Sequence, residues 1–97
     1  MRLILYSKPG CHLCEGLQEK LEQVVGTRLP FLQLEVRDIT TREDWFGAYQ
    51  YEVPVLFRVL PQRKDVEEQL PRPSPRATVQ QLEQMLQKYF PCDDKSK

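Results

Sequence analysis

Cys11 and Cys14, two cysteines separated by two residues, are the side chains of this sequence best suited to covalent chemistry. The thiolate of a cysteine is a strong nucleophile, and a C-x-x-C pair can close into a small disulfide without unfolding the protein. His12 lies between them, where its charge would tune the thiolate unless the side chain points into solvent. The spacing predicts that this pair exchanges electrons with another molecule by thiol–disulfide chemistry.

The residues around the pair predict a strand before it and a helix after it. The apolar run 3–6 indicates a buried strand, and Pro9-Gly10 indicates the turn that ends it. Beyond the motif, apolar residues recur at helical spacing as far as a stop near Gly26. The expected inner stripe of this helix is Leu13, Leu17, Leu21, Val24 and Val25. Cys11 should therefore lie at the helix N-terminus, where unpaired N–H groups and the helix dipole favour a thiolate.

The same placement predicts different roles for the two cysteines. Cys11 should lie nearer the exposed loop and attack a substrate disulfide, whereas Cys14, held in the first helical turn, should resolve the mixed disulfide. A zinc site is the structural alternative, but tetrahedral zinc needs four ligands, and outside the motif only Cys92 is offered. We therefore predict no metal ligands and expect Cys92 to be inert.

Length and composition predict a single domain over residues 1–97, with a polar tail from about residue 91. The 14 basic and 14 acidic residues cancel, so no global field favours nucleic acid or an anionic membrane. No apolar run is long enough to span a bilayer, and Met1 leads directly into a strand without a leader. Three cysteines, an odd number, fit a reducing compartment. We expect a cytoplasmic monomer that binds neither nucleic acid nor membrane.

Alternation of apolar and polar residues predicts a second strand over 31–37, with Leu32, Leu34 and Val36 on its drier face. Strand, helix and strand at this spacing predict a parallel pair joined by a right-handed crossover. Thr40 with Glu43, or Thr41 with Asp44, matches the start pattern of a short helix ending near Gln50. We expect Trp45 and Phe46 of that helix in the core, while Tyr51 could border the active site.

The second half of the chain predicts a hairpin and a last helix. Pro54 should begin its strand, because it cannot donate a hydrogen bond to a ladder. Thr78 and Gln81 form a capping box, and Pro91 should stop the helix that they open. The expected elements are a strand over 53–60, a turn over 61–64, a polar antiparallel edge strand over 65–69, a stiff proline-rich connector over 70–76 and a helix from 79.

This order of elements, with C-x-x-C at the head of a helix and Val53-Pro54 opening a later strand, resembles the thioredoxin fold in its minimal, glutaredoxin form. The segments 6–14 and 51–56 are most similar to a small glutaredoxin-like domain family long catalogued without a function, over roughly residues 2–89. The resemblance implies an α/β fold: a three-layer α/β/α sandwich with three helices and a four-stranded mixed sheet of order 2-1-3-4. It also implies that the first and third helices share one face, with the second helix on the other.

The resemblance also assigns residues beside the cysteines. Lys8 matches the family's basic residue before the motif, and Val53-Pro54 matches its cis-proline dipeptide. A cis Pro54 would place the Val53 backbone where an incoming peptide strand can pair with it. The residues alone leave two alternatives open, a solvated Lys8 and a trans Pro54 that merely starts a strand.

The chain departs from glutaredoxins at two places. His12-Leu13 stands between the cysteines instead of Pro-Tyr, and residues 73–77 replace the Gly-Gly and acidic residue that hold glutathione. Glutathione is therefore not predicted as a dedicated partner, although its use as a co-substrate is left open, and no bound cofactor is expected. We predict a disulfide oxidoreductase acting on protein or low-molecular-weight disulfides. The alternatives are a non-catalytic module that binds a partner protein and a metal- or iron–sulfur-binding module.

Overall fold

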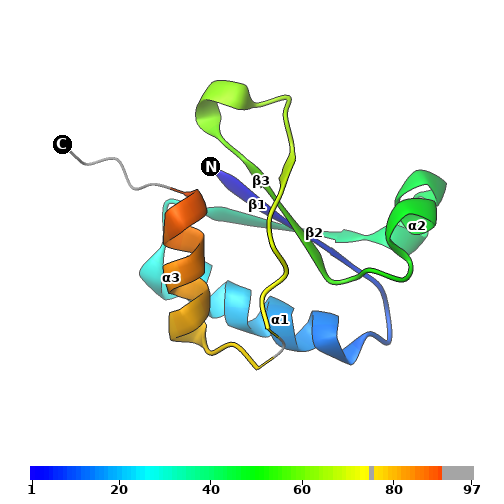
Figure 1. Ribbon diagram of the computed structural model, residues 1–97, viewed down its shortest axis with the longest axis horizontal. Helices are drawn as coiled ribbons and strands as arrows, with labels where there is room; N and C mark the ends of the chain where they lie inside the picture. The colour runs from blue at the N-terminus through cyan, green and yellow to red at the C-terminus, as the bar shows by residue number, and fades with distance from the viewer. Residues whose placement is uncertain (75, 91–97) are drawn as a thin grey trace.

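The structure is a computed structural model that describes residues 1–74 and 76–90 (Figure 1). Its strands form one mixed sheet of order β2-β1-β3-β4, in which β1 and β2 are parallel and the other pairs are antiparallel. The strands are β1 (Arg2–Ser7), β2 (Gln33–Asp38), β3 (Val55–Val59) and β4 (Glu68–Gln69), and the α-helices are α1 (His12–Gln23), α2 (Glu43–Tyr49) and α3 (Val79–Tyr89). The sheet order and the three helices confirm the predicted α/β architecture.

The central strand β1 is covered on both faces, which explains its uninterrupted apolar run. Leu3 and Leu5 pack into one cluster and Ile4 and Tyr6 into another, and all four are at most 3% exposed. Helices α1 and α3 cover the first face and α2 the second (Figure 1). Among the helical residues in these clusters are Leu21, Leu82 and Leu86 on the α1/α3 side and Trp45 and Tyr49 on the α2 side. The predicted distribution of helices is confirmed.

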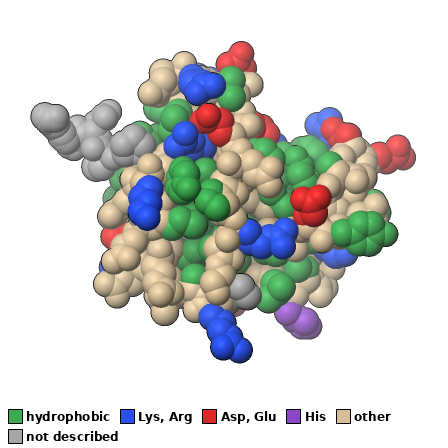
Figure 2. Space-filling view, in the orientation of Figure 1, with side chains coloured by type: hydrophobic (Ala, Val, Ile, Leu, Met, Phe, Trp, Pro, Cys, Tyr) green, Lys and Arg blue, Asp and Glu red, His purple; other side chains and the backbone are tan. Residues whose placement is uncertain are grey.

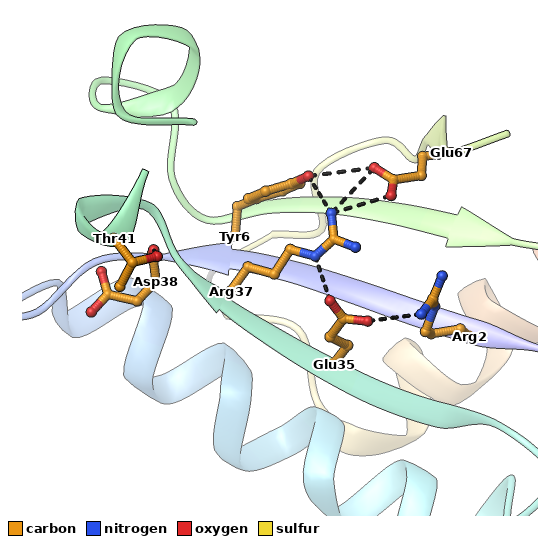
Figure 3. A network of polar contacts seen from close by, with 7 residues as sticks. All are labelled: Arg2, Tyr6, Glu35, Arg37, Asp38, Thr41 and Glu67. Carbon is orange, nitrogen blue, oxygen red and sulfur yellow. Dashed lines mark hydrogen bonds and ion pairs between the residues drawn. The ribbon is translucent and has the colours of Figure 1, made fainter. Parts of the chain in front are cut away.

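A polar network on the α2 side fixes the C-terminal half of β1 (Figure 3). Arg37 on β2 donates through Nη1 to the Tyr6 hydroxyl at 2.7 Å and pairs with Glu67 at 3.2 Å. Its Nε donates to Glu35, which also pairs with Arg2 at 3.1 Å. These contacts join the edge strand β2 to the segment before β4 across the face of β1 and β3.

Aromatic rings surround the Arg37 guanidinium, which lies 5.5 Å from the Tyr6 ring centroid and 5.3 Å from that of Trp45. Burial opposes the charge of Arg37, but its hydrogen bonds to Glu35 and Tyr6 outweigh burial and raise its pKa. Burial also raises the pKa of Tyr6, with Arg37 acting in the opposite direction. Arg37 is therefore a charged side chain packed within the fold, although the alternating pattern of the strand placed it on the polar face.

This network corrects the predicted second strand. The alternation placed Val36 toward the core and Arg37 toward water, but Val36 is 39% exposed and the Arg37 side chain only 15%. The reason is that Arg37 faces α2, where rings and carboxylates receive it. The strand also begins at Gln33 instead of Phe31, which is 38% exposed.

The first helix differs from the prediction at both ends. Leu13 was expected on the inner stripe but is 58% exposed, because it lies on the solvent side of α1, whereas the next residue, Cys14, is 1% exposed. Gly26 does not end the helix. The chain continues through a π-helical turn, Val24–Arg28, and the Leu29 N–H then bonds the Val24 carbonyl at 2.8 Å. Leu29 is 3% exposed, and its burial accompanies this extension.

The predicted capping boxes of the second helix are wrong. Asp38 instead caps a 3₁₀ turn, Ile39–Thr41, by accepting a hydrogen bond from the Thr40 N–H at 2.9 Å. The N-cap of α2 is Arg42, which makes no side-chain cap bond, and α2 ends at Tyr49, near Gln50 as predicted. Trp45 is half-buried as expected, but Phe46 is 39% exposed on this short helix.

In the second half, β3 begins at Val55, just after Pro54, and only Glu68–Gln69 of the predicted edge strand pair with it. The capping box of Thr78 and Gln81 is confirmed. The predictions for Pro91, Cys92 and the polar tail lie outside the described residues. Within residues 1–74 and 76–90, no helix has the length and apolar character to cross a membrane.

We expect Thr78→Ala to lower the free energy of unfolding by about 1 kcal/mol, because the Gln81 N–H loses the Thr78 hydroxyl that accepts its hydrogen bond in the capping box. Urea denaturation followed by circular dichroism measures the change. Gln80→Ala, at an exposed position in the same helical turn, is the control and should change stability by less than about 0.5 kcal/mol. Equal losses in the two variants would contradict the role of the cap.

We expect Tyr6→Phe to lower the free energy of unfolding by about 1–2 kcal/mol, because the half-buried Arg37 loses a hydrogen-bond acceptor. Tyr49→Phe is the matched control, since it lies in the same aromatic cluster and its hydroxyl makes no hydrogen bond within the described part of the chain. The comparison uses urea midpoints at constant m-value. A Tyr49→Phe loss as large as that of Tyr6→Phe would contradict the importance of the Tyr6–Arg37 bond.

Candidate functional site

The turn that leads from β1 to the cysteines depends on one glycine. Gly10 has a φ of +81°, in the left-handed region that residues with a Cβ rarely adopt. The Cys11 N–H then bonds the Lys8 carbonyl at 3.3 Å, which closes the turn. The central strand therefore delivers Cys11 directly to the start of α1.

Cys11 is the N-cap residue of α1, with extended backbone angles (φ −89°, ψ 103°). Its Sγ accepts a hydrogen bond from the Cys14 N–H at 3.2 Å, in the position that a serine or aspartate oxygen takes in an ordinary cap. The two sulfurs lie at disulfide-bonding distance, with Cα atoms 5.2 Å apart. Cys11 is partly exposed and Cys14 is 1% exposed, so Cys11 is the sulfur of the pair that a second molecule can reach.

The two basic side chains next to the cysteines are directed away from each other. Lys8 Nζ donates to the carbonyl of Gln50, the C-cap residue of α2, at 3.1 Å. The His12 side chain is 96% exposed, with Nδ1 3.9 Å from a Glu15 carboxylate oxygen. His12 thus takes the solvent-facing position that the sequence left open, and Lys8 lies against the end of α2 where a cation is favoured.

The Val53–Pro54 peptide bond is cis, as the resemblance implied, and the trans alternative is wrong. Pro54 is buried and lines a groove together with His12 and Leu13, which places it beside the cysteine motif. Val53 packs against the cluster of the α2 face, and its N–H donates to the Tyr49 carbonyl at 3.1 Å. The Val53 N–H is therefore already bonded within the chain. Tyr51, two residues earlier, is 90% exposed.

Two hollows flank the cysteine motif, each of about 220 Å³. One is lined by Cys14 and Lys8, together with Asp38 at the end of β2. The other, which we call the α1 groove, lies between the exposed side of α1 and the proline-rich segment. The α1 groove is lined by His12, Leu13, Gly16, Leu17, Lys20, Pro54, Arg72, Pro73, Ser74 and Ala77.

Apart from His12 and Pro54, which were predicted site residues, the sequence did not predict the residues of the α1 groove. Residues 70–76 were interpreted only as a connector, and Leu13 and Leu17 only as core. A signal was nevertheless present, because positions 13, 16, 17 and 20 share one side of a helix and end in a lysine. The structure joins that side to Arg72 and Pro73.

The described residues contain no group of three or more His, Cys, Asp or Glu side chains that could hold a metal ion. Cys92, the remaining cysteine, lies outside the part of the chain that the structure describes.

The fold and the site can be compared with known proteins. A solved structure described as the X-ray structure of Northeast Structural Genomics target protein XcR50 from X. campestris is similar to this chain, with 26% sequence identity and a TM-score of 0.56. The similarity covers 89% of this chain and 96% of the other. No curated protein matches the sequence.

The family comparison covers the sheet, the cysteine motif and most of α3. Residues 2–87 match the family described as glutaredoxin-like domain (DUF836). That range contains both cysteines of the motif, the cis Val53–Pro54 bond and the α1 groove. The chain therefore belongs to the glutaredoxin-like domain family.

Proposed function

We propose that this protein is a thiol–disulfide oxidoreductase that uses Cys11 and Cys14. The observation that carries the proposal is the unequal exposure of two sulfurs at bonding distance, with the exposed sulfur at a helix N-cap. The Cys14 N–H and the positive end of the α1 dipole would stabilise negative charge on Cys11. Cys14, buried one turn further on, is protected from direct attack by a second molecule.

The reaction follows from this arrangement. The Cys11 thiolate attacks a substrate disulfide, forming a Cys11–substrate disulfide and releasing one substrate thiolate, which takes a proton from water. The Cys14 thiol loses its proton, and its thiolate attacks Cys11 Sγ, forming the Cys11–Cys14 disulfide and releasing the second substrate thiol. The substrate gains two electrons and the protein dithiol loses two. A thiol reductant must return the protein to the dithiol state for a second turnover.

Four further residues are proposed to support this exchange. Lys8 would tune the charge around Cys11 from the turn, and His12, which faces solvent, would contribute only when an approaching substrate draws its side chain toward the cysteines. The cis Pro54 and the carbonyl of Val53 would contact the substrate beside the cysteines. The proposed reaction needs no bound cofactor, and its substrate would be a protein or small-molecule disulfide. The protein would act as a cytoplasmic monomer.

A reversible internal disulfide is the first expectation. Mild oxidation of the reduced chain should lower the free thiols, measured after denaturation, from three to one, because Cys11 and Cys14 disappear together. Cys11→Ser should retain its two remaining thiols under the same conditions, and Cys92→Ser, the control, should still lose a pair. Oxidation of a single thiol per chain, or visible-range absorbance and stoichiometric metal, would contradict the proposal.

A trapped intermediate is the second expectation. Cys14→Ser cannot resolve the mixed disulfide and should accumulate substrate on Cys11, visible as added mass that a reductant removes. The matched variant Cys11→Ser should trap little, because Cys14 is 1% exposed. More adduct on Cys11→Ser than on Cys14→Ser would reverse the proposed roles.

Turnover separates an oxidoreductase from a binding module. The wild-type chain should reduce a glutathione mixed disulfide or an insulin-type protein disulfide in the presence of a thiol reductant. A reversible internal disulfide without turnover of either substrate would favour a non-catalytic module that binds a partner protein.

A further inference from the structure

The α1 groove begins at the cysteine motif and has an apolar lining that is open to solvent. Leu13 is 58% exposed, and Leu17, Pro54 and Pro73 continue the lining. Apolar surface that is contiguous and rimmed by polar residues is typical of an interaction site, whereas a single exposed apolar side chain is not. The groove thus offers apolar contact to a molecule whose disulfide has reached Cys11.

The charges of the α1 groove have one sign. Lys20 and Arg72 are among its lining residues, and among the described residues that line it no side chain is acidic. The chain as a whole has a formal net charge of +0, so this excess is local. Figure 2 shows basic side chains beside exposed hydrophobic atoms on the lower part of the molecule, where α1 and the proline-rich segment run. A carboxylate bound in the groove would therefore lie near Lys20 and Arg72, and no acidic side chain among the described lining residues would repel it.

Both cations are fixed by backbone carbonyls. Lys20 Nζ donates to the Ala77 carbonyl at 2.6 Å, and Arg72 Nη2 donates to the Glu52 carbonyl. An ammonium has three donors and a guanidinium five, so each group keeps donors for a ligand. Holding the cation in place reduces the side-chain entropy that would be lost when a carboxylate binds.

The length of the groove suggests the kind of ligand. Lys20 follows Cys11 by about 13 Å along the helix axis at 1.5 Å per residue. An extended peptide covers that distance with about four residues. A carboxylate near Lys20 would thus belong to a residue roughly four positions from the cysteine that reacts with Cys11.

We propose that the α1 groove binds an acidic segment of a protein disulfide substrate, with apolar residues against Leu13 and Pro54 and a carboxylate between Lys20 and Arg72. This inference rests on the proposed exchange reaction and adds its substrate class. In the first step the Cys11–substrate bond forms, the substrate disulfide breaks, and the leaving peptide thiolate takes a proton from water.

The test uses short peptides with one cysteine, apolar neighbours, and Glu, Gln or Lys four residues from the cysteine on either side. Each peptide is supplied as its symmetrical disulfide, and formation of the mixed disulfide on reduced Cys14→Ser is timed by mass spectrometry. Rates are divided by those of a small neutral thiol with the same peptide, which removes intrinsic reactivity. At low salt the Glu peptide of one series should react about threefold to tenfold faster than its Gln partner, and the Lys peptide more slowly.

Charge variants made in the Cys14→Ser background locate the effect. Lys20→Gln with Arg72→Gln should remove the preference for Glu, whereas Lys64→Gln with Lys88→Gln, at exposed positions outside the α1 groove, removes the same charge and should retain it. Lys20→Arg, with Arg72 unchanged, keeps the positive charge and should therefore retain the preference for Glu. High salt should weaken it in the unsubstituted groove.

Four outcomes would overturn the inference. Equal rates for the Glu, Gln and Lys peptides would remove the acidic substrate class and leave the exchange reaction intact. An equal slowing of all peptides by Lys20→Gln with Arg72→Gln would mean that these cations only hold the proline-rich segment. A glutathione disulfide that outpaces every peptide and depends on both cations would assign the groove to a small molecule. Failure of all peptides and of glutathione disulfide to react would overturn the proposed function together with this inference.

Discussion

Burial of β1 on both faces is the constraint on which the site depends. Leu3 and Leu5 are enclosed by the α1 and α3 side, and Ile4 and Tyr6 by the α2 side, so the strand has little freedom to shift. Its last residues lead through the Gly10 turn to Cys11. The Cys11 sulfur is therefore presented by the most enclosed strand of the sheet, which lies between β2 and β3.

The local chemistry of helix capping completes the arrangement. A helix start needs an acceptor for its first N–H groups, and Cys11 supplies a sulfur where oxygen is usual. The contact that satisfies the backbone would also stabilise a thiolate in the proposed reaction. Cys11 is thus a structural cap residue as well as the proposed nucleophile, whereas Cys14 contributes its N–H to the cap and its side chain to the core.

The features that follow from local rules were predictable, and those that depend on distant contacts were not. The strand–turn–helix around Cys11, the capping box at Thr78 and the parallel β1–β2 pair follow from residue type and spacing. The cis bond and the sheet order required the family resemblance, because proline alone favours trans. The low exposure of the Arg37 side chain depends on its contacts with Tyr6, Trp45 and Glu67. These residues lie outside β2, so the alternation of apolar and polar residues within one strand could not predict the contacts. The α1 groove was missed for the same reason, since it exists only where α1 meets the proline-rich segment.

The hydrogen bond from the Val53 N–H to the Tyr49 carbonyl limits how the proposed substrate chain could pair with the backbone at this residue. In an antiparallel pair, opposite residues exchange two bonds, which fixes both the position and the direction of the added strand. With the Val53 donor engaged, main-chain attachment at this residue reduces to a single acceptor. A chain attached at one point can pivot and slide, so its alignment relative to Cys11 must be set by side chains seated elsewhere on the surface.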